Sequence, residues 1–108
     1  MLHVLNVVPD QGMAIVSASM SADHNASVVE TAKHDLKSRA SAKIPSEISV
    51  ECHIARGTIY DQIIKNADNL GADCIIVGAH SPELKDYLIG PNAARVARHA
   101  EQSVFVIR

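Results

Sequence analysis

Hydrophobic residues along this chain follow two repeating patterns, one typical of strands and one typical of helices. Short apolar runs predict strands, and apolar residues at steps of three and four predict amphipathic helices. The predicted strands are Leu2–Val8, Ile48–Ile54, Ala72–Gly78 and Ser103–Ile107. The predicted helices are Asn25–Lys43, Ile59–Leu70 and Asn92–Ala100. The segment Met13–His24 has no dependable period, and we expect a loop or a weak helix there.

The helix that Gly57-Thr58 opens has the clearest end signals. Thr58 can cap its first turn, and Asp61 stands at the third helical position. Gly71 follows Leu70, at the position where a left-handed C-cap favours glycine. These residues indicate where the helix begins and ends.

The alternation of strands and helices predicts an α/β fold, with a doubly wound parallel sheet and helices on both faces. The run Ala72–Gly78 is apolar almost throughout, as expected of a strand buried on both faces. With 108 residues and 47% apolar content, the chain is expected to form a single domain over 1–108. A domain of this size is modestly stable and would gain from a partner subunit.

Charge and composition argue against several classes of partner. Ten basic and 12 acidic residues give a net charge of −2, and the scattered basic residues predict no nucleic-acid partner. One Phe, two Tyr and no Trp leave few platforms on which bases could stack. The N-terminal apolar run is too short for a membrane span or signal peptide, so no membrane contact and a cytoplasmic location are expected. Cys52 and Cys74 are interpreted as reduced, buried thiols.

Two glycines fall where an open parallel sheet binds ligands, beyond the carboxyl ends of its strands. Gly78 ends a predicted strand, and Gly90 stands just before a predicted helix. Glycine at such a turn lets the backbone approach a phosphate, and the helix that follows supplies N–H groups. By itself this signal is weak, because glycine is common in turns that bind no ligand.

The sequence around these glycines points more specifically to one family. The stretch GAHSPELKDYLIGPNAARVARHA (78–100), followed by SVFVIR (103–108), resembles the C-terminal signature of the universal stress protein family, closest to its F/G-type branch. The resemblance extends to Gly57 and to the Ala72-Asp73 pair. It implies a five-stranded, flavodoxin-like three-layer sandwich of the adenine nucleotide alpha hydrolase-like type. In ATP-binding members, a G-x-x-G motif is followed after a spacer by Gly-Ser or Gly-Thr.

When this motif is compared with the chain position by position, two of its four defining residues are present. Gly78 matches its first glycine and Gly90 its last, whereas Ser81 replaces the second glycine and Pro91 the Ser or Thr. Pro91 offers a phosphate neither a hydroxyl nor an N–H, so up to two donors are lost, each worth about 1 to 3 kcal/mol. The side-chain amide of Asn92 could restore one of them.

The resemblance implies ATP or AMP as the ligand, with Mg²⁺ as a companion of the nucleotide. Val8 is expected near the adenine, and His80 could donate a hydrogen bond to a phosphate, although a solvent-exposed loop histidine is the alternative. The implied nucleotide-binding residues are Val8, Gly78, His80, Ser81, Gly90, Asn92 and Ala93.

Family members begin with a strand that ends in an Asp near the ligand, and this chain starts at what corresponds to their second strand. That first strand is central to the family's sheet. Without it, Leu2–Val8 and Cys74–Val77 would each have an edge whose backbone N–H and C=O groups lack a partner. Such unpaired groups destabilise the fold unless another segment pairs with them. We therefore expect a family fold truncated at its N-terminus, either as a fragment or as a domain whose missing strand is replaced by exchange or rearrangement.

The leading hypothesis is a homodimeric stress-response regulator that binds ATP or AMP at the glycine-rich loop. The resemblance implies that Ser103–Ile107 pairs with its own copy across a two-fold axis. The alternative is a dimeric interaction module that has lost nucleotide binding, which Pro91 and the absent Asp favour.

Catalysis is rated lowest. The sequence offers no general base and no assured carboxylate for Mg²⁺, so no catalytic residue is assigned, although a slow ATPase stays open. No metal ligand is assigned either. Cys52 and His53 are neighbours in a strand and should point to opposite faces of the sheet.

Overall fold

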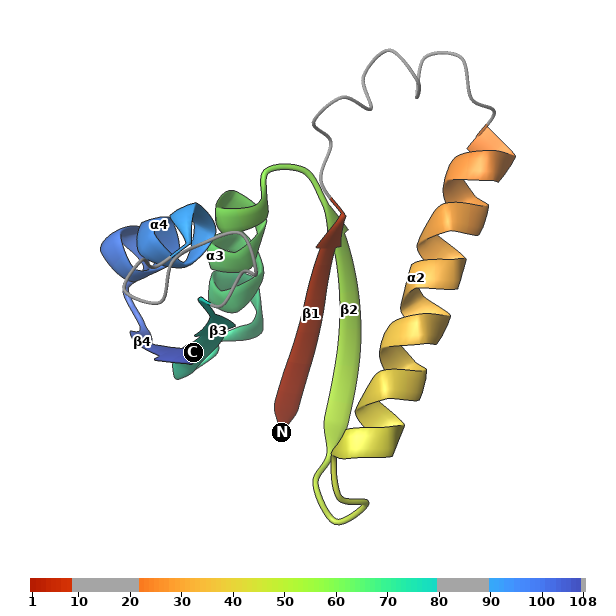
Figure 1. The fold of residues 1–108 in the computed structure, drawn as a ribbon, viewed down its shortest axis with the longest axis horizontal. Coiled ribbons are helices and arrows are strands. Elements are labelled where there is room, and N and C mark those ends of the chain that lie inside the picture. The colour runs from red at the N-terminus through yellow and green to blue at the C-terminus, as the bar shows by residue number, and fades with distance from the viewer. Residues whose placement is uncertain (9–21, 80–89, 108) are drawn as a thin grey trace. The chain divides into compact units, whose positions relative to one another are not determined.

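Strands and helices alternate along the chain in the computed structural model, which describes residues 1–8, 22–79 and 90–107 (Figure 1). The strands are β1 (Leu2–Val8), β2 (Val50–Arg56), β3 (Cys74–Gly78) and β4 (Ser103–Ile107). The helices are α2 (Ala22–Lys43), α3 (Ile59–Leu70) and α4 (Pro91–His99). The α/β class and the order of these elements are confirmed. Most of the segment 13–24, predicted to be a loop or weak helix, lies outside the described residues.

The strands form two parallel pairs. β1 pairs with β2, with Leu2 opposite Val50, and β3 pairs with β4, with Cys74 opposite Ser103. Within the described ranges, each sheet has two strands and no ladder joins β1 to β3. β1 and β3 are the two strands for which the sequence predicts a missing neighbour. The predicted parallel pairing is confirmed, but the continuous sheet is replaced by two separate ones.

The chain divides into two compact units, Met1–Thr58 and Ile59–Arg108. The first contains β1, α2 and β2, and the second contains α3, β3, α4 and β4. The expectation of one domain over 1–108 stays a prediction. In the part of the chain that is described, no helix combines the length and the apolar character needed to cross a membrane.

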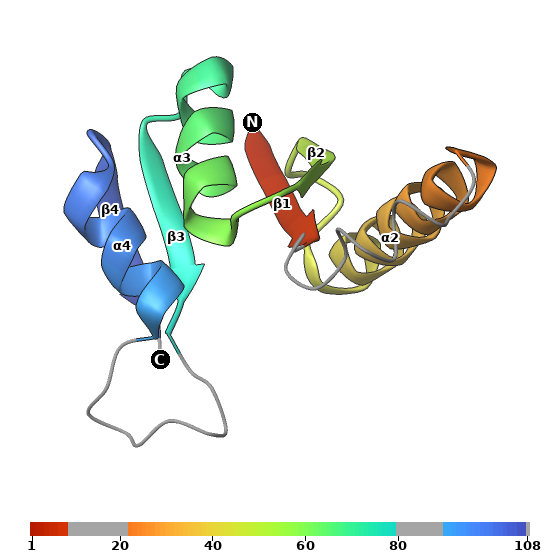
Figure 2. The ribbon, with the colours of Figure 1, turned by 90° about the horizontal axis from the view of Figure 1, so that it is seen from above.

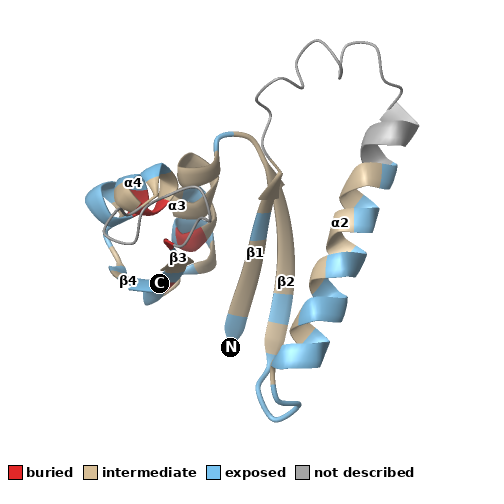
Figure 3. Ribbon diagram, in the orientation of Figure 1, coloured by how far each residue is buried: buried red, intermediate tan, exposed pale blue. Residues whose placement is uncertain are grey.

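In the first unit, α2 packs against β2 and also contacts β1. The predicted apolar stripe of α2 is half-buried, and most of the charged positions around it are exposed (Figure 3). This stripe consists of Val28, Val29, Ala32, Leu36 and Ala40. The amphipathic character of the helix is therefore confirmed, and its backbone begins at Ala22, three residues before the predicted start.

β2 lies two residues further along the chain than predicted. The N–H of Ile48 donates to the carbonyl of Pro45 at 3.1 Å, so Ile48 belongs to the turn after α2. Pairing with β1 is reached only at Ser49, whose carbonyl accepts the N–H of Leu2 at 2.8 Å. Apolar alternation from Ile48 onward did not distinguish the turn from the strand, because the turn depends on Pro45 and on the position of β1.

The second unit has its core between the two helices and one face of the β3/β4 sheet. Val96 is fully buried, and it packs with Ala67 and Ile75. Half-buried apolar residues surround these three: Tyr60, Ile63, Ala72, Val77, Ala100 and Val104. The amphipathic character predicted for α3 and α4 is confirmed in outline, although Ala97, an apolar residue four positions after Ala93, is exposed.

The opposite face of this sheet is exposed. Ile76, Phe105 and Ile107 expose 62%, 57% and 54% of their surface. Successive strand residues point to opposite faces, and α3 and α4 cover the face that carries Ile75. The prediction that β3 is buried on both faces is therefore wrong. Cys74 in the same strand was predicted to be buried, but it is an exposed free thiol.

The end of α3 follows the predicted glycine cap. Gly71 has a φ of 65°, in the left-handed region. Its N–H donates to the carbonyl of Asp68 at 3.2 Å, and the N–H of Ala72 donates to that of Ala67 at 2.9 Å. These two bonds are the pair that defines a Schellman motif. They turn the chain sharply from α3 into β3, so that the strand runs back along the helix.

Candidate functional site

The start of α4 has the features of a helix N-terminus that can bind an anion. Gly90 is the N-cap residue, with extended backbone angles of φ −62° and ψ 155°, and its carbonyl accepts the N–H of Ala94 at 2.9 Å. Pro91 occupies the first helical position. N–H groups in the first turn of a helix have no partner within the helix, and the helix dipole makes this end partly positive. Since proline has no N–H, Asn92 and Ala93 supply the N–H groups available here.

Gly78, the other predicted glycine, ends β3. A Cβ added at Gly78 would meet no atom of the described residues within 4 Å, so their packing does not require glycine there. The chain continues the ladder for one more step, because the N–H of Ala79 donates to the carbonyl of Ile107 at 2.8 Å. Glycine at this point leaves the backbone at the strand end open to approach.

The carboxyl end of β3 and the first turn of α4 lie at the same end of the second unit (Figure 2). This follows from the connection, because α4 runs back along the sheet between two parallel strands. Gly78 and Gly90 therefore stand at the two ends of one connection, on the side of the sheet where parallel folds bind ligands.

The predicted site residues fall into three groups. Gly78, Gly90, Asn92 and Ala93 belong to the second unit. The side chain of Ala93 is buried in the core, at 4% exposure, so only its backbone N–H can serve a ligand. Val8 ends β1 in the first unit, where its carbonyl accepts the N–H of Gly57 at 3.1 Å. His80 and Ser81 lie outside the described residues.

A pocket of about 470 Å³ in the first unit lies away from the predicted ligand end. Its β2 residues, Val50 and Cys52, belong to the amino half of that strand, whereas the predicted nucleotide site uses carboxyl ends. The remaining lining residues come from α2 and the turn after it: Lys37, Ala40, Ser41, Ile44, Pro45, Ser46 and Ile48. The pocket therefore provides no support for the nucleotide prediction.

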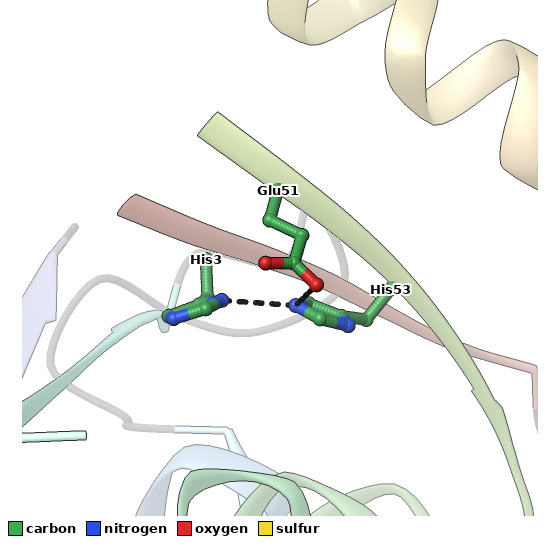
Figure 4. A group of neighbouring side chains, drawn as sticks. All are labelled: His3, Glu51 and His53. Carbon is green, nitrogen blue, oxygen red and sulfur yellow. Dashed lines mark hydrogen bonds and ion pairs between the residues drawn. The ribbon is translucent and has the colours of Figure 1, made fainter. Parts of the chain in front are cut away.

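A second group of polar side chains lies on the β1/β2 sheet. His3 Nδ1 is 2.9 Å from His53 Nε2, and Glu51 Oε1 is 3.9 Å from the same His53 nitrogen (Figure 4). The two imidazole rings have centroids 5.1 Å apart. These three residues bring two nitrogen ligands and a carboxylate to one place on the sheet.

The sequence interpretation missed this group because it considered Cys52 and His53 as neighbours in one strand. The third member comes from another strand: His3 lies directly opposite Glu51 in the β1/β2 register. Glu51 and His53, two residues apart, share a face. A histidine in one strand and a Glu-x-His pair in its parallel neighbour would have been the signal, had the register been known.

Comparison with known proteins gives a consistent result along the whole chain. The model of the Universal stress protein family matches residues 1–108. Universal stress protein G of Shigella flexneri is 30% identical to the chain over 115 residues, covering 99% of this chain and 77% of the relative. Universal stress protein G of Salmonella typhimurium is 28% identical over the same coverage.

Solved structures share the fold at lower identity. Hypothetical protein MJ0577 superposes with a TM-score of 0.79 and 24% identity, covering 97% of this chain and 73% of that protein. Hypothetical protein PH0823 gives a TM-score of 0.77 and 20% identity, with the same coverage. A universal stress protein in complex with cAMP gives 0.61 and 21%, covering 99% of this chain and 72% of that one. At these identities the likeness establishes the fold.

Proposed function

The chain belongs to the universal stress protein family, and on this premise we propose that it is a stress-response protein that binds an adenine nucleotide, ATP or AMP. The observation that carries the proposal is the start of α4, where Gly90 caps the helix at the same end of the unit as the carboxyl end of β3. In this proposal the phosphates lie between Gly78 and the first turn of α4. A related structure of a universal stress protein in complex with cAMP supports the choice of ligand class.

Three donors on α4 would hold the phosphates. They are the backbone N–H groups of Asn92 and Ala93 and the side-chain amide of Asn92. Asn92 is half-buried, so part of its surface is accessible to a ligand. The partial positive charge of the helix end adds to them. His80, Ser81 and Val8 stay predicted members of the site, and Mg²⁺ would accompany a triphosphate.

The affinity should be low for a site of this type. Pro91 begins α4 in place of a residue with both an N–H and a hydroxyl. Each missing hydrogen bond to a charged phosphate removes about 1 to 3 kcal/mol of binding energy. We therefore expect binding at high micromolar or millimolar nucleotide rather than at nanomolar concentrations.

We further propose that the protein acts in the cytoplasm as a homodimer joined through β4. The Ile107 carbonyl faces β3, since it accepts the N–H of Ala79. Polar groups of adjacent strand residues point to opposite sides, so the N–H and carbonyl of Val106 face the other edge of β4. That edge has no partner among the described strands. Pairing with a second copy would satisfy it and would also shield Phe105 and Ile107.

Calorimetric titration of the chain with ATP, AMP and cAMP tests nucleotide binding. We expect one nucleotide per chain, with an accompanying rise in Tm. Asn92→Ala should weaken binding about tenfold, as expected for the loss of one hydrogen bond to a charged group. Asn69→Ala is the matched control. Asn69 is exposed in the last turn of α3 and is not among the proposed ligand residues, so its replacement should not affect binding. Absence of heat and of thermal protection at millimolar nucleotide would refute the proposal.

The alternative is a dimeric interaction module without a nucleotide, and Pro91 at the first position of α4 favours it. A dimer that forms at micromolar concentration but binds none of the three nucleotides would identify this function. Phosphate release from ATP above a protein-free control would instead point to a slow ATPase. The three functions therefore differ in two measurements, nucleotide binding and phosphate release.

A further inference from the structure

We propose that His3, Glu51 and His53 form a binding site for a late first-row divalent cation, with Zn²⁺ as the expected ion (Figure 4). All three residues belong to the first unit, and none of them is among the residues proposed for the nucleotide. It is built from β1 and β2, which pair in parallel over their whole length.

The distances suit a shared ion. The possible ligand atoms of the three side chains all lie within 4.8 Å of one another. Ligand atoms about 2.0 to 2.2 Å from a tetrahedral Zn²⁺ are about 3.4 Å apart. The measured separations, 2.9 Å between the two imidazole nitrogens and 3.9 Å from the carboxylate oxygen to His53 Nε2, lie on either side of that value. Small rotations of the side chains, without movement of the strands, would bring all three atoms to one ion.

The backbone fixes where these side chains start. His3 stands opposite Glu51 in the ladder, and His53 stands one pair further along, opposite Leu5. Val50 and Cys52, which line the pocket beside α2, alternate with Glu51 and His53 and so point to the other face of the sheet. Helix α2 therefore does not cover the cluster. The side chain of Glu51 is 56% exposed and that of His53 is 19% exposed, so solvent reaches the cluster.

The donor set decides the class of ion. Two imidazole nitrogens and one carboxylate oxygen suit Zn²⁺ and its first-row neighbours, whereas Mg²⁺ and Ca²⁺ prefer oxygen ligands alone. Cys52 points to the opposite face and supplies no sulfur. Three protein ligands leave the fourth tetrahedral position to water.

The short contact between the rings shows what the ion would replace. At 2.9 Å, His3 Nδ1 and His53 Nε2 share one hydrogen bond, so one ring carries the proton and the other presents a lone pair. For Zn²⁺ to bind both facing lone pairs, this proton moves through solvent to the other nitrogen of the same ring. The neighbouring carboxylate of Glu51 compensates part of the added charge. The competing explanation is that the pair is only a cross-strand hydrogen bond that stabilises the sheet.

Competition titration of the full chain with Zn²⁺ against a chromophoric chelator distinguishes these explanations. We expect one Zn²⁺ bound per chain at the tightest site. His3→Gln and Glu51→Gln should each lower the affinity by at least about tenfold, in line with the loss of a ligand or of its orienting partner. His34→Gln is the matched control, because His34 is exposed on α2 and lies outside the cluster. It should leave the affinity unchanged.

Co²⁺ provides a second reading of the same site. Bound Co²⁺ should show weak visible absorption from nitrogen and oxygen ligands, without the strong near-ultraviolet band that a thiolate ligand produces. Glu51→Gln tests the proposal without loss of the His3–His53 pair, and circular dichroism verifies that the variants are folded. At the same Zn²⁺ concentration, the rise in Tm should be smaller for Glu51→Gln than for the wild-type chain.

Two results would overturn the site. One is wild-type Zn²⁺ affinity in both His3→Gln and Glu51→Gln, which would mean that the side chains serve the sheet alone. The other is an equal loss in His34→Gln, which would mean that scattered histidines bind the ion. If His3→Gln fails to fold, Glu51→Gln and the Co²⁺ spectrum decide the question by themselves.

Discussion

The guanidinium carbon of Arg95 lies 5.1 Å from the centroid of the Tyr60 ring, and this contact joins α4 to the first turn of α3. A cation over an aromatic face contributes about 0.5 to 1 kcal/mol when the site is partly exposed. Arg95→Gln should therefore lower the free energy of unfolding by that amount, as measured by urea unfolding. Arg98→Gln, an exposed position on the same helix, should have less effect. Equal losses in the two variants would assign the effect to helix charge rather than to the ring.

Gly71, which ends α3, and Gly78, which ends β3, should respond differently to alanine. A side chain at Gly71 would meet no atom within 4 Å, but its φ of 65° is strained for any L-residue. Gly71→Ala should cost about 1 to 2 kcal/mol of unfolding free energy. Gly78→Ala should cost less than about 0.5 kcal/mol, since Gly78 has open space and no positive φ. Thermal and urea unfolding of the pair measure this difference, and similar losses would contradict it.

Val96 should be the most sensitive apolar position of the second unit, because its side chain is fully buried. Val96→Ala removes two methyl groups and leaves a cavity, for a loss of about 2 to 3 kcal/mol. Val106→Ala makes the same chemical change at a residue that is 37% exposed, and its loss should be smaller. Urea unfolding followed by circular dichroism compares the two. A larger loss at Val106 would show that the core lies elsewhere.

Replacing Pro91 should strengthen nucleotide binding. Pro91→Thr supplies a backbone N–H and a hydroxyl at the first position of α4. If one of these donates to a phosphate, the affinity for ATP should rise about tenfold, or more if both do. Titration calorimetry measures the change, and Pro91→Val is the control that restores the N–H without the hydroxyl. An unchanged Kd in both variants would argue that the phosphates do not lie at this helix end.

The edge of β4 can be tested without disturbing its ladder to β3. Val106→Pro removes an N–H that faces the free edge, so it should weaken the proposed dimer while leaving the β3/β4 pairing in place. Val106→Ala keeps that N–H and should leave the dimer intact. Sedimentation velocity over a range of protein concentrations gives the dissociation constant of the dimer. If Val106→Pro dimerises as the wild type does, the subunits pair through another surface.

Much of the candidate nucleotide site could be predicted from local sequence. The sequence predicted a helix from Asn92 with Gly90 just before it, and the structure begins α4 one residue earlier, at Pro91, with Gly90 as its N-cap. Gly71 was recognisable as a C-cap for the same reason, since its role depends on neighbouring residues alone. The relation of Val8 to these residues involves segments far apart in the chain and stays a prediction.

The histidine cluster shows what local sequence could not provide. His3 and His53 are 50 residues apart, and the contact between them depends on the register of β1 against β2. A shift of that register by one residue would place His3 on the other face relative to its neighbours. No periodicity within either strand specifies the register, so the cluster became visible only with the strands paired.

By itself, the sequence determined the strands and helices of this protein, the glycine cap that ends α3, and the family to which it belongs, because these depend on residues close together or on long matching stretches. Only the tertiary structure decided which strands pair, that Ile76 and Phe105 are exposed, and that His3 meets Glu51 and His53. The physical reason is that pairing and burial are set by contacts between distant segments. An apolar run predicts a strand equally well whether one of its faces is covered or both.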